Sequence, residues 1–370
     1  MSVTPTDVCT VIPTDSSAPQ ALYRIEPLKD PRWDRFLENH SHASVFHSTA
    51  WLTALQRTYG YDSIAYTTSP PEEDLQNGIV FCCVESWLTG RRLVSLPFSD
   101  HCALLVQRVE DAKVLLAGIE QELRKGKWRY IEMRPLESVG GATLLQHPAT
   151  TYTLHQIDLS PDLDALFASF HKDSIQRKIR RAEREGLLYV ERSDASLLDA
   201  FYQLHVNTRR RHEMPPPPRN WFRNLMECFG ESLKIRLAFK GERPVAGMLT
   251  LRYKDTLVYK YGGADTHFNN LGATHLLYWK SIQDAKNSGL RTFDLGRSDA
   301  HQTGLITFKS RWGSTKATLT YARFAVSKNF RDAFDSVGAG WKARIAKHAF
   351  AHAPSGVLSV LGNLLYKHAG

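Results

Sequence analysis

The sequence lacks a long apolar run: none of its 370 residues belongs to a stretch of about 18 apolar residues. Its first twenty residues carry neither the basic start nor the apolar centre of a signal peptide. We therefore expect a cytoplasmic protein that does not span a membrane. We expect residues 1–20 to be a disordered leader.

Cysteine is scarce, and the sequence contains no motif typical of a metal site or a serine nucleophile. The five cysteines are an odd number and include no C-x-x-C pair. The sequence therefore supports neither a disulfide framework nor a zinc site, and the cysteines are expected to be reduced core residues. We predict no bound metal.

Acidic residues are also in deficit. There are 47 Lys and Arg against 38 Asp and Glu, which gives a formal net charge of +9. Such an excess favours an anionic partner such as tRNA, a nucleotide, a lipid pyrophosphate or a membrane surface, although it can also serve solubility alone. Residues 326–370 hold six of the basic residues and two acidic ones. We expect this basic amphipathic tail either to lie on anionic lipid or to pack on the second domain.

The length suits two domains, which we place at residues 21–150 and 151–325. In the first domain, Ser48 is a good N-cap for an amphipathic helix that Gly60 should end. Strand-like runs separated by turn residues follow that helix. The order of elements predicts a mixed α/β fold.

The second domain has a similar order of elements. Three apolar runs between Ile235 and Asp265 are joined by turns so short that the strands must pair antiparallel. A helix capped by Asn269 or Asn270 and stopped by Gly289 should then lead into a further strand.

An arithmetic coincidence supports an internal duplication. Arg134 and Arg297 each stand eight residues after a glycine that stops a helix, Gly126 and Gly289 respectively. Together with the shared order of strands and helices, this spacing favours two copies of one unit.

Six phrases stand out across residues 22–325: SVFHSTAWLTAL, KIRRAEREG, NTRRRHEMP, VYKYGGAD, FDLGRS and GLITFKSRWG. Together and in this order, they resemble one known family, the FemAB-like acyltransferases of the GNAT superfamily. The resemblance implies two tandem GNAT-like domains, each with a mixed, mainly antiparallel sheet flanked by helices. Classical members transfer amino acids from aminoacyl-tRNA to the peptide of a peptidoglycan precursor. This chain lacks an obvious helical arm for tRNA, which leaves the donor open between aminoacyl-tRNA and acyl-CoA.

Two basic segments are candidates for binding an anionic acceptor. Arg177 and Arg181 share a face of a predicted helix, which could receive phosphates or simply be a salt-bridged surface. Arg211 and His212 enter a run of four prolines that begins at Pro215, and this rigid basic loop would suit a nucleotide-sugar or a lipid pyrophosphate.

The resemblance adds candidates around these segments. It implies that Thr208, Arg211, Tyr259 and Tyr261 line the acceptor cleft. The helix start that contains Asn270, Gly272 and Ala273 is either a phosphate cradle for the co-substrate or a plain capped helix start.

The stretch from Phe293 to Gly313 reads as a strand, a charged glycine-bent loop and a restart near Phe308 and Lys309. Acyl transfer to an amine needs a group that stabilises the oxyanion of the tetrahedral intermediate. The resemblance implies this role for Lys309, the lysine of the Phe308–Lys309 pair, while the alternative is a surface lysine beside a core phenylalanine. Arg297 and the glycine loop would be the scaffold that aims the pair. The general base stays open among Asp294, Asp299 and His301, and Asp294 could instead pair with Arg297.

We therefore predict an acyltransferase that moves an acyl or aminoacyl group to an amine of a cell-envelope precursor, related to peptidoglycan or polysaccharide. We expect no permanently bound cofactor, an anionic small-molecule or lipid-linked acceptor, and contact with tRNA or an anionic membrane at the inner face of the plasma membrane. The alternative is a non-catalytic protein that binds RNA or lipid phosphate. The sequence does not indicate which oligomeric state the protein has.

Overall fold

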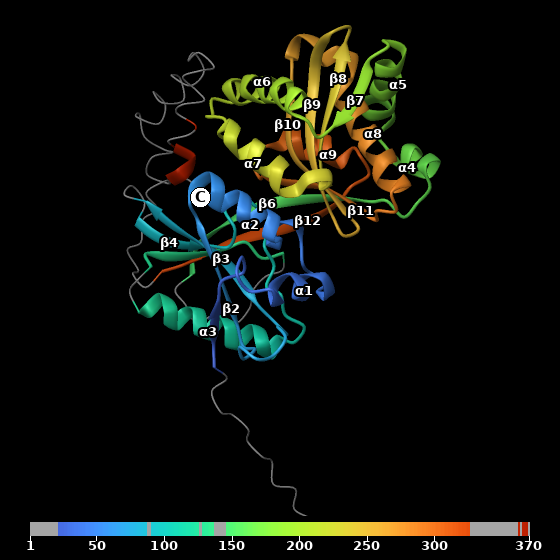
Figure 1. Cartoon of the computed structure of the whole chain (residues 1–370). Helices are drawn as coiled ribbons and strands as arrows, with labels where there is room; N and C mark the ends of the chain where they lie inside the picture. The colour runs from blue at the N-terminus through green and yellow to red at the C-terminus, as the bar shows by residue number, and fades with distance from the viewer. Residues whose placement is uncertain are drawn as a thin grey trace, which may run out of the picture.

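The computed structural model describes residues 21–86, 90–125, 128–136, 146–325, 362 and 365–368. In this part of the chain, twelve strands form one sheet in the order β1-β2-β3-β4-β5-β12-β6-β11-β10-β9-β8-β7. Figure 1 shows two halves, with helices flanking the strands of each, joined by the long strands β6 and β12. The predicted mixed α/β fold with a mainly antiparallel sheet is confirmed.

The elements of the first half are β1 (Tyr23–Ile25), α1 (Arg32–Asn39), α2 (Thr49–Tyr59), β2 (Asp62–Thr67), β3 (Ile79–Ser86), β4 (Gly90–Val94), α3 (Val109–Arg124), β5 (Tyr130–Met133) and β6 (Gln146–Asp158). The elements of the second half are α4 (Leu163–Ser169), α5 (Arg177–Arg184), β7 (Leu188–Arg192), α6 (Ala195–Arg211), α7 (Arg219–Phe229), β8 (Leu233–Lys240), β9 (Arg243–Tyr253), β10 (Thr256–Ala264), α8 (Ala273–Asn287), β11 (Thr292–Asp299), α9 (Thr303–Ser310) and β12 (Thr315–Phe324).

The first amphipathic helix forms as its end signals predict. The Ser48 Oγ accepts a hydrogen bond from the backbone N–H of Trp51 at 3.2 Å, and Gly60 ends α2 in the left-handed region at φ 73°. The start of α8 differs from the prediction. A 3-10 turn at Thr266–Leu271 precedes it, and Gly272 is the N-cap residue, so neither Asn269 nor Asn270 caps the helix.

The two halves repeat one unit. In the first, β4 and β5 pair in parallel around the connecting helix α3; in the second, β10 and β11 pair in parallel around α8. The strands before each parallel pair are antiparallel, including the predicted hairpins β8–β9 and β9–β10. This repetition supports the duplication inferred from the spacing of Arg134 and Arg297.

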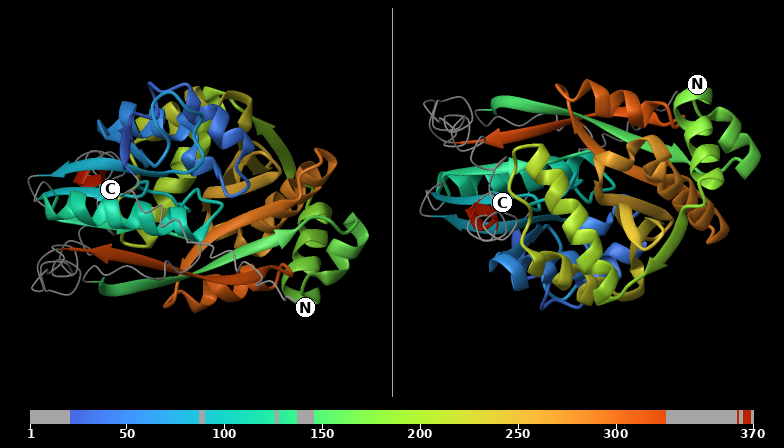
Figure 2. Two further views of the ribbon diagram at one scale, coloured as in Figure 1. Left: turned by 90° about the horizontal axis from the view of Figure 1, so that it is seen from below. Right: turned by 90° about the horizontal axis from the view of Figure 1, so that it is seen from above.

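The two halves exchange their last strands. Strand β12, from the end of the second half, pairs with β5 of the first half and with β6, whereas β6 pairs with β11 of the second half. Figure 2 shows β6 and β12 running side by side. The predicted domain division after residue 150 therefore falls inside β6, and it stays a prediction.

One of the hydrophobic clusters spans both halves. Trp51 of α2 packs edge-on against Trp221 of α7, with ring centroids 5.1 Å apart. At the tip of the β9–β10 hairpin, the Lys254 ammonium donates to the backbone carbonyls of Leu37 and His40 at 2.6 and 2.7 Å. The second half is thus fastened to the end of α1.

Of the predicted tail, the structure describes only residues 362 and 365–368, and the leader lies outside the described residues. Tyr366 lies against both halves: its hydroxyl accepts a hydrogen bond from the Arg209 guanidinium at 3.0 Å, and its carbonyl accepts one from the Tyr61 hydroxyl at 3.2 Å. Among the described residues, no helix is long and apolar enough to cross a bilayer.

Candidate active site at the junction of the two halves

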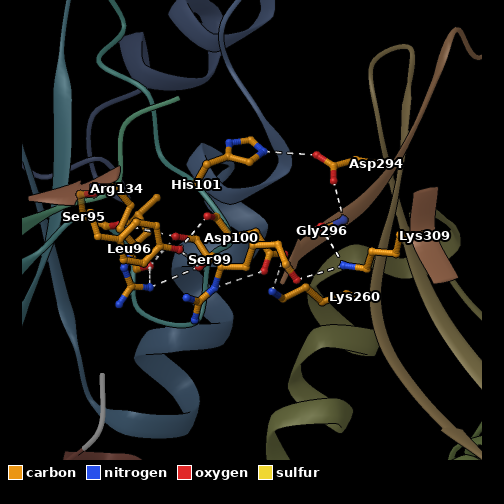
Figure 3. Close-up of polar contacts among 12 residues, drawn as sticks. Ser95, Leu96, Ser99, Asp100, His101, Arg134, Lys260, Asp294, Gly296 and Lys309 are labelled. Carbon is orange, nitrogen blue, oxygen red and sulfur yellow. Dashed lines mark hydrogen bonds and ion pairs between the residues drawn. The ribbon is translucent and has the colours of Figure 1, made fainter. Parts of the chain in front are cut away.

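Lys309 lies on helix α9, so the Phe308–Lys309 pair belongs to a helix and not to a restarted strand. The residue is 2 % exposed. Its ammonium donates hydrogen bonds to the backbone carbonyls of Gly296 at 2.8 Å and Arg297 at 3.0 Å (Figure 3). Lys309 is therefore not the surface lysine of the alternative prediction, because its ammonium group is buried against strand β11.

A bulge in β11 creates the carbonyl pair that holds Lys309. Between Asp294 and Arg297 the pairing with β6 shifts register, and Gly296 adopts φ 70°. The Asp294 carboxylate fixes the bulge by accepting a hydrogen bond from the Gly296 backbone N–H at 2.7 Å. Glycine is required here because its φ is positive.

A second bulge, in β10, positions Lys260. The register with β9 shifts between Tyr259 and Tyr261, which turns the intervening lysine out of the regular alternation. Its ammonium lies 2.9 Å from the Asp100 carboxylate and 5.1 Å from the centroid of the Phe46 ring. Lys260 therefore reaches from the second half into the first.

Asp100 is the contribution of the first half to this site. It follows β4 in a loop where Leu96 and Phe98 both adopt positive φ, at 60° and 61°, a conformation that is unusual and strained for side chains of this size. Asp100 lies between Lys260 and Arg297, whose Nε is 3.8 Å from its second oxygen.

Aromatic rings from the exchanged strands hold Arg297. Its guanidinium lies 4.0 Å from the ring centroid of Tyr152 on β6 and 5.0 Å from that of Tyr321 on β12. Arg134, its counterpart in the first half, lies 5.2 Å from the same Tyr321 ring. The two arginines related by the duplication thus meet at one tyrosine.

These groups belong to one set of interacting charges, which we call the junction network. Its members are Lys260, Lys309, Arg134, Arg297, Arg323, Asp100, Glu132 and Asp294. Five cationic side chains therefore face three carboxylates. Because charges are poorly solvated in a protein interior, this positive excess favours negative charge that arrives with a substrate or develops during a reaction.

The surroundings of Lys309 alter its acidity. Burial lowers the pKa of Lys309 to about 8, although Asp100 and Asp294 partly oppose this shift. Burial likewise lowers the pKa of Lys260. Burial raises the pKa of Asp100, but Lys260 and Arg297 outweigh it and hold that pKa below its ordinary value.

The three candidate bases occupy different places. Asp294 does not pair with Arg297: besides the Gly296 N–H, it lies within hydrogen-bond reach of the Gln156 amide and of His101, both at 3.3 Å. Asp299 and His301 are exposed, at the end of β11 and in the turn before α9. None of these positions identifies a base.

The aromatic candidates have well-defined neighbours. Phe308 packs edge-on against Tyr278 and contacts the hydrophobic core of the second half. Tyr259 packs on Tyr278 as well, and burial raises the pKa of Tyr259 to about 12. The Tyr261 hydroxyl accepts a hydrogen bond from the indole N–H of Trp221 at 2.8 Å.

The candidates on α6 gather at the far end of β10. The Thr208 hydroxyl accepts a hydrogen bond from the backbone N–H of Ala264 at 3.1 Å, and Arg211 donates to the carbonyl of Ala264 at 3.4 Å. His212 is exposed at the C-terminal end of α6. Their contacts join this group to β10 and not directly to Lys309.

Arg177 and Arg181 lie on α5, and each has an acidic neighbour. Arg177 is 3.8 Å from Asp173 and Arg181 is 3.5 Å from Glu185, both at the i,i+4 spacing. Such exposed pairs contribute little to stability. The geometry therefore matches the salt-bridged alternative and leaves the arginines accessible to solvent.

The start of α8 is closely covered by α5. Asn270 is exposed, whereas Gly272 and Ala273 are buried. A Cβ at Gly272 would lie 2.3 Å from the carbonyl oxygen of Lys178, so this glycine allows the two helices to approach. A carbonyl oxygen at this position disfavours a pyrophosphate, and the arrangement favours a plain helix start over a phosphate cradle.

Asp100, Lys260, Tyr152 and Tyr321 were not among the predicted site residues. The sequence around Asp100 has no distinctive motif, and Lys260 is hidden within the phrase VYKYGGAD, where only the tyrosines seemed informative. The glycine pair that follows, Gly262 and Gly263, was the available signal of an irregular strand. In the described residues, no group of three His, Cys, Asp or Glu side chains could hold a metal ion.

Comparison with known proteins agrees with this architecture. Residues 169–310 match a family described as an acetyltransferase (GNAT) domain. Over 135 residues, the chain is 24% identical to the UDP-N-acetylmuramoylpentapeptide-lysine N(6)-alanyltransferase of Weissella viridescens. That match covers 36% of this chain and 40% of the relative, so less than half of the relative's length is spanned.

Solved structures share the fold across most of the chain. The crystal structure of FemX is 14% identical with a TM-score of 0.62, covering 80% of this chain and 96% of FemX. A tandem GNAT protein from the clavulanic acid biosynthesis pathway is 9% identical with a TM-score of 0.52, covering 84% and 99% of the two chains. The predicted resemblance to FemAB-like acyltransferases of the GNAT superfamily is thereby confirmed, and residues 169–310 carry the similarity to the acetyltransferase (GNAT) domain family.

Proposed function

We propose that the protein transfers an acyl or aminoacyl group from an activated donor to an amine of a cell-envelope precursor, related to peptidoglycan or polysaccharide. The donor would be an aminoacyl-tRNA ester or an acyl-CoA thioester. The name of the Weissella viridescens relative supports an amine acceptor of the peptidoglycan type. The covered start of α8 favours the ester over the thioester, because it offers little room for a pyrophosphate.

The observation that carries the proposal is the excess of positive over negative side chains in the buried junction network around Lys309. In the reaction, the amine nitrogen forms a bond to the donor carbonyl carbon, and the carbonyl electron pair moves onto oxygen. The resulting oxyanion collapses and the bond from the carbonyl carbon to the donor oxygen or sulfur breaks. The proton lost by the attacking amine ends on that oxygen or sulfur, which leaves as the alcohol or thiol. Cations fixed in a site from which water is excluded stabilise such an oxyanion far more than they would in water.

The residues divide into three roles. Lys309 supplies the charge at the reacting carbonyl, and Arg297, stacked on Tyr152, supplies a second cation beside it. Asp100 is a positioning residue that holds Lys260 and Arg297 in place. Thr208, Arg211, His212, Tyr259 and Tyr261 are proposed to line the acceptor side, with Arg177 and Arg181 as an outer basic surface.

The proposed setting is the cytoplasm, at the inner face of the plasma membrane, where a lipid-linked anionic acceptor would be found. The net charge of +9 supports peripheral attraction to anionic lipid, and exposed arginines on α5 support contact with a phosphate chain such as tRNA.

A chemical rescue experiment tests the catalytic role of Lys309. The Lys309→Cys variant should lose about 10²–10³-fold in kcat, the range for removal of one oxyanion-stabilising group. Because position 309 is buried, the new thiol is alkylated with 2-bromoethylamine in the unfolded chain, which is then refolded; this rebuilds a lysine analogue and should restore most of the rate. Transfer is followed by mass spectrometry of an envelope-precursor substrate. The matched control is Lys316→Cys, at an exposed position on the neighbouring strand β12.

The non-catalytic alternative makes a different prediction. A protein that only binds RNA or lipid phosphate would show no turnover with any donor, and its binding would weaken steeply with salt. Unchanged transfer in Lys309→Cys with intact substrate binding would show that the catalytic assignment is wrong.

A further inference from the structure

Residues 365–368 form a helical turn that contacts both halves of the chain (red in Figure 1), and we call it the bridging turn. The first half holds three consecutive backbone carbonyls of this turn: those of Tyr366 and Lys367 accept hydrogen bonds from the Tyr61 hydroxyl at 3.2 and 2.9 Å, and that of His368 accepts one from the Arg92 guanidinium at 2.8 Å. Carbonyl oxygens carry partial negative charge, so hydroxyl and guanidinium donors bind the turn by its backbone.

The second half holds the same turn by one side chain. The Tyr366 hydroxyl accepts a hydrogen bond from the Arg209 guanidinium at 3.0 Å and lies 3.4 Å from the Pro215 carbonyl, to which it donates. The Tyr366 ring lies 5.4 Å from the ring of Phe98, which belongs to the first half. Arg209 follows Thr208 on α6, among the residues proposed for the acceptor side. The bridging turn therefore lies on that side of the junction.

Arg209 has only neutral partners among the described residues. Its guanidinium donates to the Pro215 carbonyl at 3.1 Å and to the Tyr366 hydroxyl. Burial raises the pKa of Tyr366, although Arg209 opposes this shift, so the hydroxyl is uncharged near neutral pH. Because a guanidinium binds a charged oxygen more strongly than a neutral one, an anionic ligand can compete with Tyr366 for Arg209.

The junction does not depend on the bridging turn for its shape. In the loop that carries Asp100, Arg134 donates to the carbonyls of Leu96 at 2.9 Å and Ser99 at 3.3 Å. The Tyr321 hydroxyl donates to the carbonyl of Asp100 at 2.6 Å. These hydrogen bonds stay in place if the bridging turn leaves. The turn therefore covers the acceptor side without building the charged site next to it.

We propose that the bridging turn is an autoinhibitory segment, which an anionic group of phosphate type displaces when it binds at Arg209. The turn and the ligand exclude each other because both need the guanidinium of Arg209. The apparent affinity for the anion is then reduced by the fraction of molecules in which the turn is closed. The term acceptor side rests on the proposed acyl transfer, whereas the competition for Arg209 does not.

The test is calorimetric titration of the full chain with inorganic pyrophosphate, together with sedimentation on vesicles of phosphatidylglycerol. Tyr366→Ala removes the competing side chain and should lower the Kd of one of these probes about tenfold or more. A gain with pyrophosphate alone identifies a soluble phosphate group, and a gain with vesicles alone identifies a lipid headgroup. Tyr366→Phe keeps the ring against Phe98, so it should fold as the wild type does and lower the Kd about threefold.

The double variant Tyr366→Ala/Arg209→Met should lose the gain, because the anion then lacks its guanidinium. The matched control is Leu365→Ala, which changes the neighbouring, exposed side chain of the same turn and should bind both probes as the wild type does. Where transfer is measured, Tyr366→Ala should lower the KM of the acceptor and leave kcat unchanged.

A protein that transfers nothing would still show the change in Kd, so a failure of the proposed function is distinguishable from a failure of this inference. The inference is overturned if Tyr366→Ala binds neither probe more tightly than the wild type does, or if Leu365→Ala produces the same gain. Weaker binding by Tyr366→Ala would also overturn it, because the turn would then be part of the binding site.

Discussion

Replacing Lys309 by methionine should change how the stability of the protein depends on pH. In the unfolded chain the lysine keeps its proton up to its ordinary pKa of 10.5, whereas in the folded chain burial lowers this pKa to about 8. Between these values the unfolded state binds more protons, so the stability of the wild type rises with pH. A shift from 10.5 to about 8 corresponds to roughly 3 kcal/mol across this interval. The methionine variant lacks this gain.

The assay is urea unfolding followed by tryptophan fluorescence, at several pH values from 7 to above 10, for wild type, Lys309→Met and the exposed control Lys316→Met. Near neutral pH, two effects of Lys309→Met oppose each other. The variant no longer has to bury a cation, which stabilises the folded state. It also leaves the carbonyls of Gly296 and Arg297 without their hydrogen-bond donor, which lowers the stability by about 1–3 kcal/mol for each carbonyl. The informative quantity is therefore the slope of the free energy of unfolding against pH, compared between the wild type and Lys309→Met. Parallel pH profiles for wild type and Lys309→Met would refute the assignment of a depressed pKa to Lys309.

Two further substitutions probe the surroundings of the site. Asp100→Asn leaves the buried Lys260 without its counter-ion, so we expect a loss of about 3–5 kcal/mol of stability together with loss of transfer. In the double variant Asp100→Asn/Lys260→Met, unfolding measurements should show most of the stability restored. A double variant as unstable as Asp100→Asn alone would contradict the ion pairing. Gly272→Ala adds a Cβ at 2.3 Å from the Lys178 carbonyl at a residue with φ 80°, which should cost about 1–3 kcal/mol in a thermal or urea melt, and an unchanged melt would contradict the close packing of α5 on α8.

Local signals predicted the secondary structure well where the responsible interactions are close in sequence. Ser48 and Gly60 bound α2 as expected, because capping involves residues within one helical turn. The short turns of the second half likewise determined antiparallel hairpins. The predicted start of α8 was wrong: Gly272, in the left-handed region, is the N-cap residue, and it lies close to Lys178, which is distant in sequence.

The site was only partly predictable for the same reason. Lys309 was found through a family phrase, but its burial depends on a bulge in β11 that no periodic pattern indicates. Lys260 escaped notice because regular alternation gives no sign that a bulge redirects it. Asp100 comes from the other half of the chain, and only tertiary pairing brings it within 2.9 Å of Lys260.

The reciprocal pairing of β6 and β12 bears on how this chain can be divided. A fragment that ends before β12 would expose the backbone of β5 and one side of β6, and a fragment that begins after β6 would leave β11 with an open edge. Unpaired edges of this kind invite aggregation. Each half thus depends on the other to complete its sheet. An ancestor with a single unit would have needed to pair its last strand with its own sheet, or to exchange that strand with a second copy of itself.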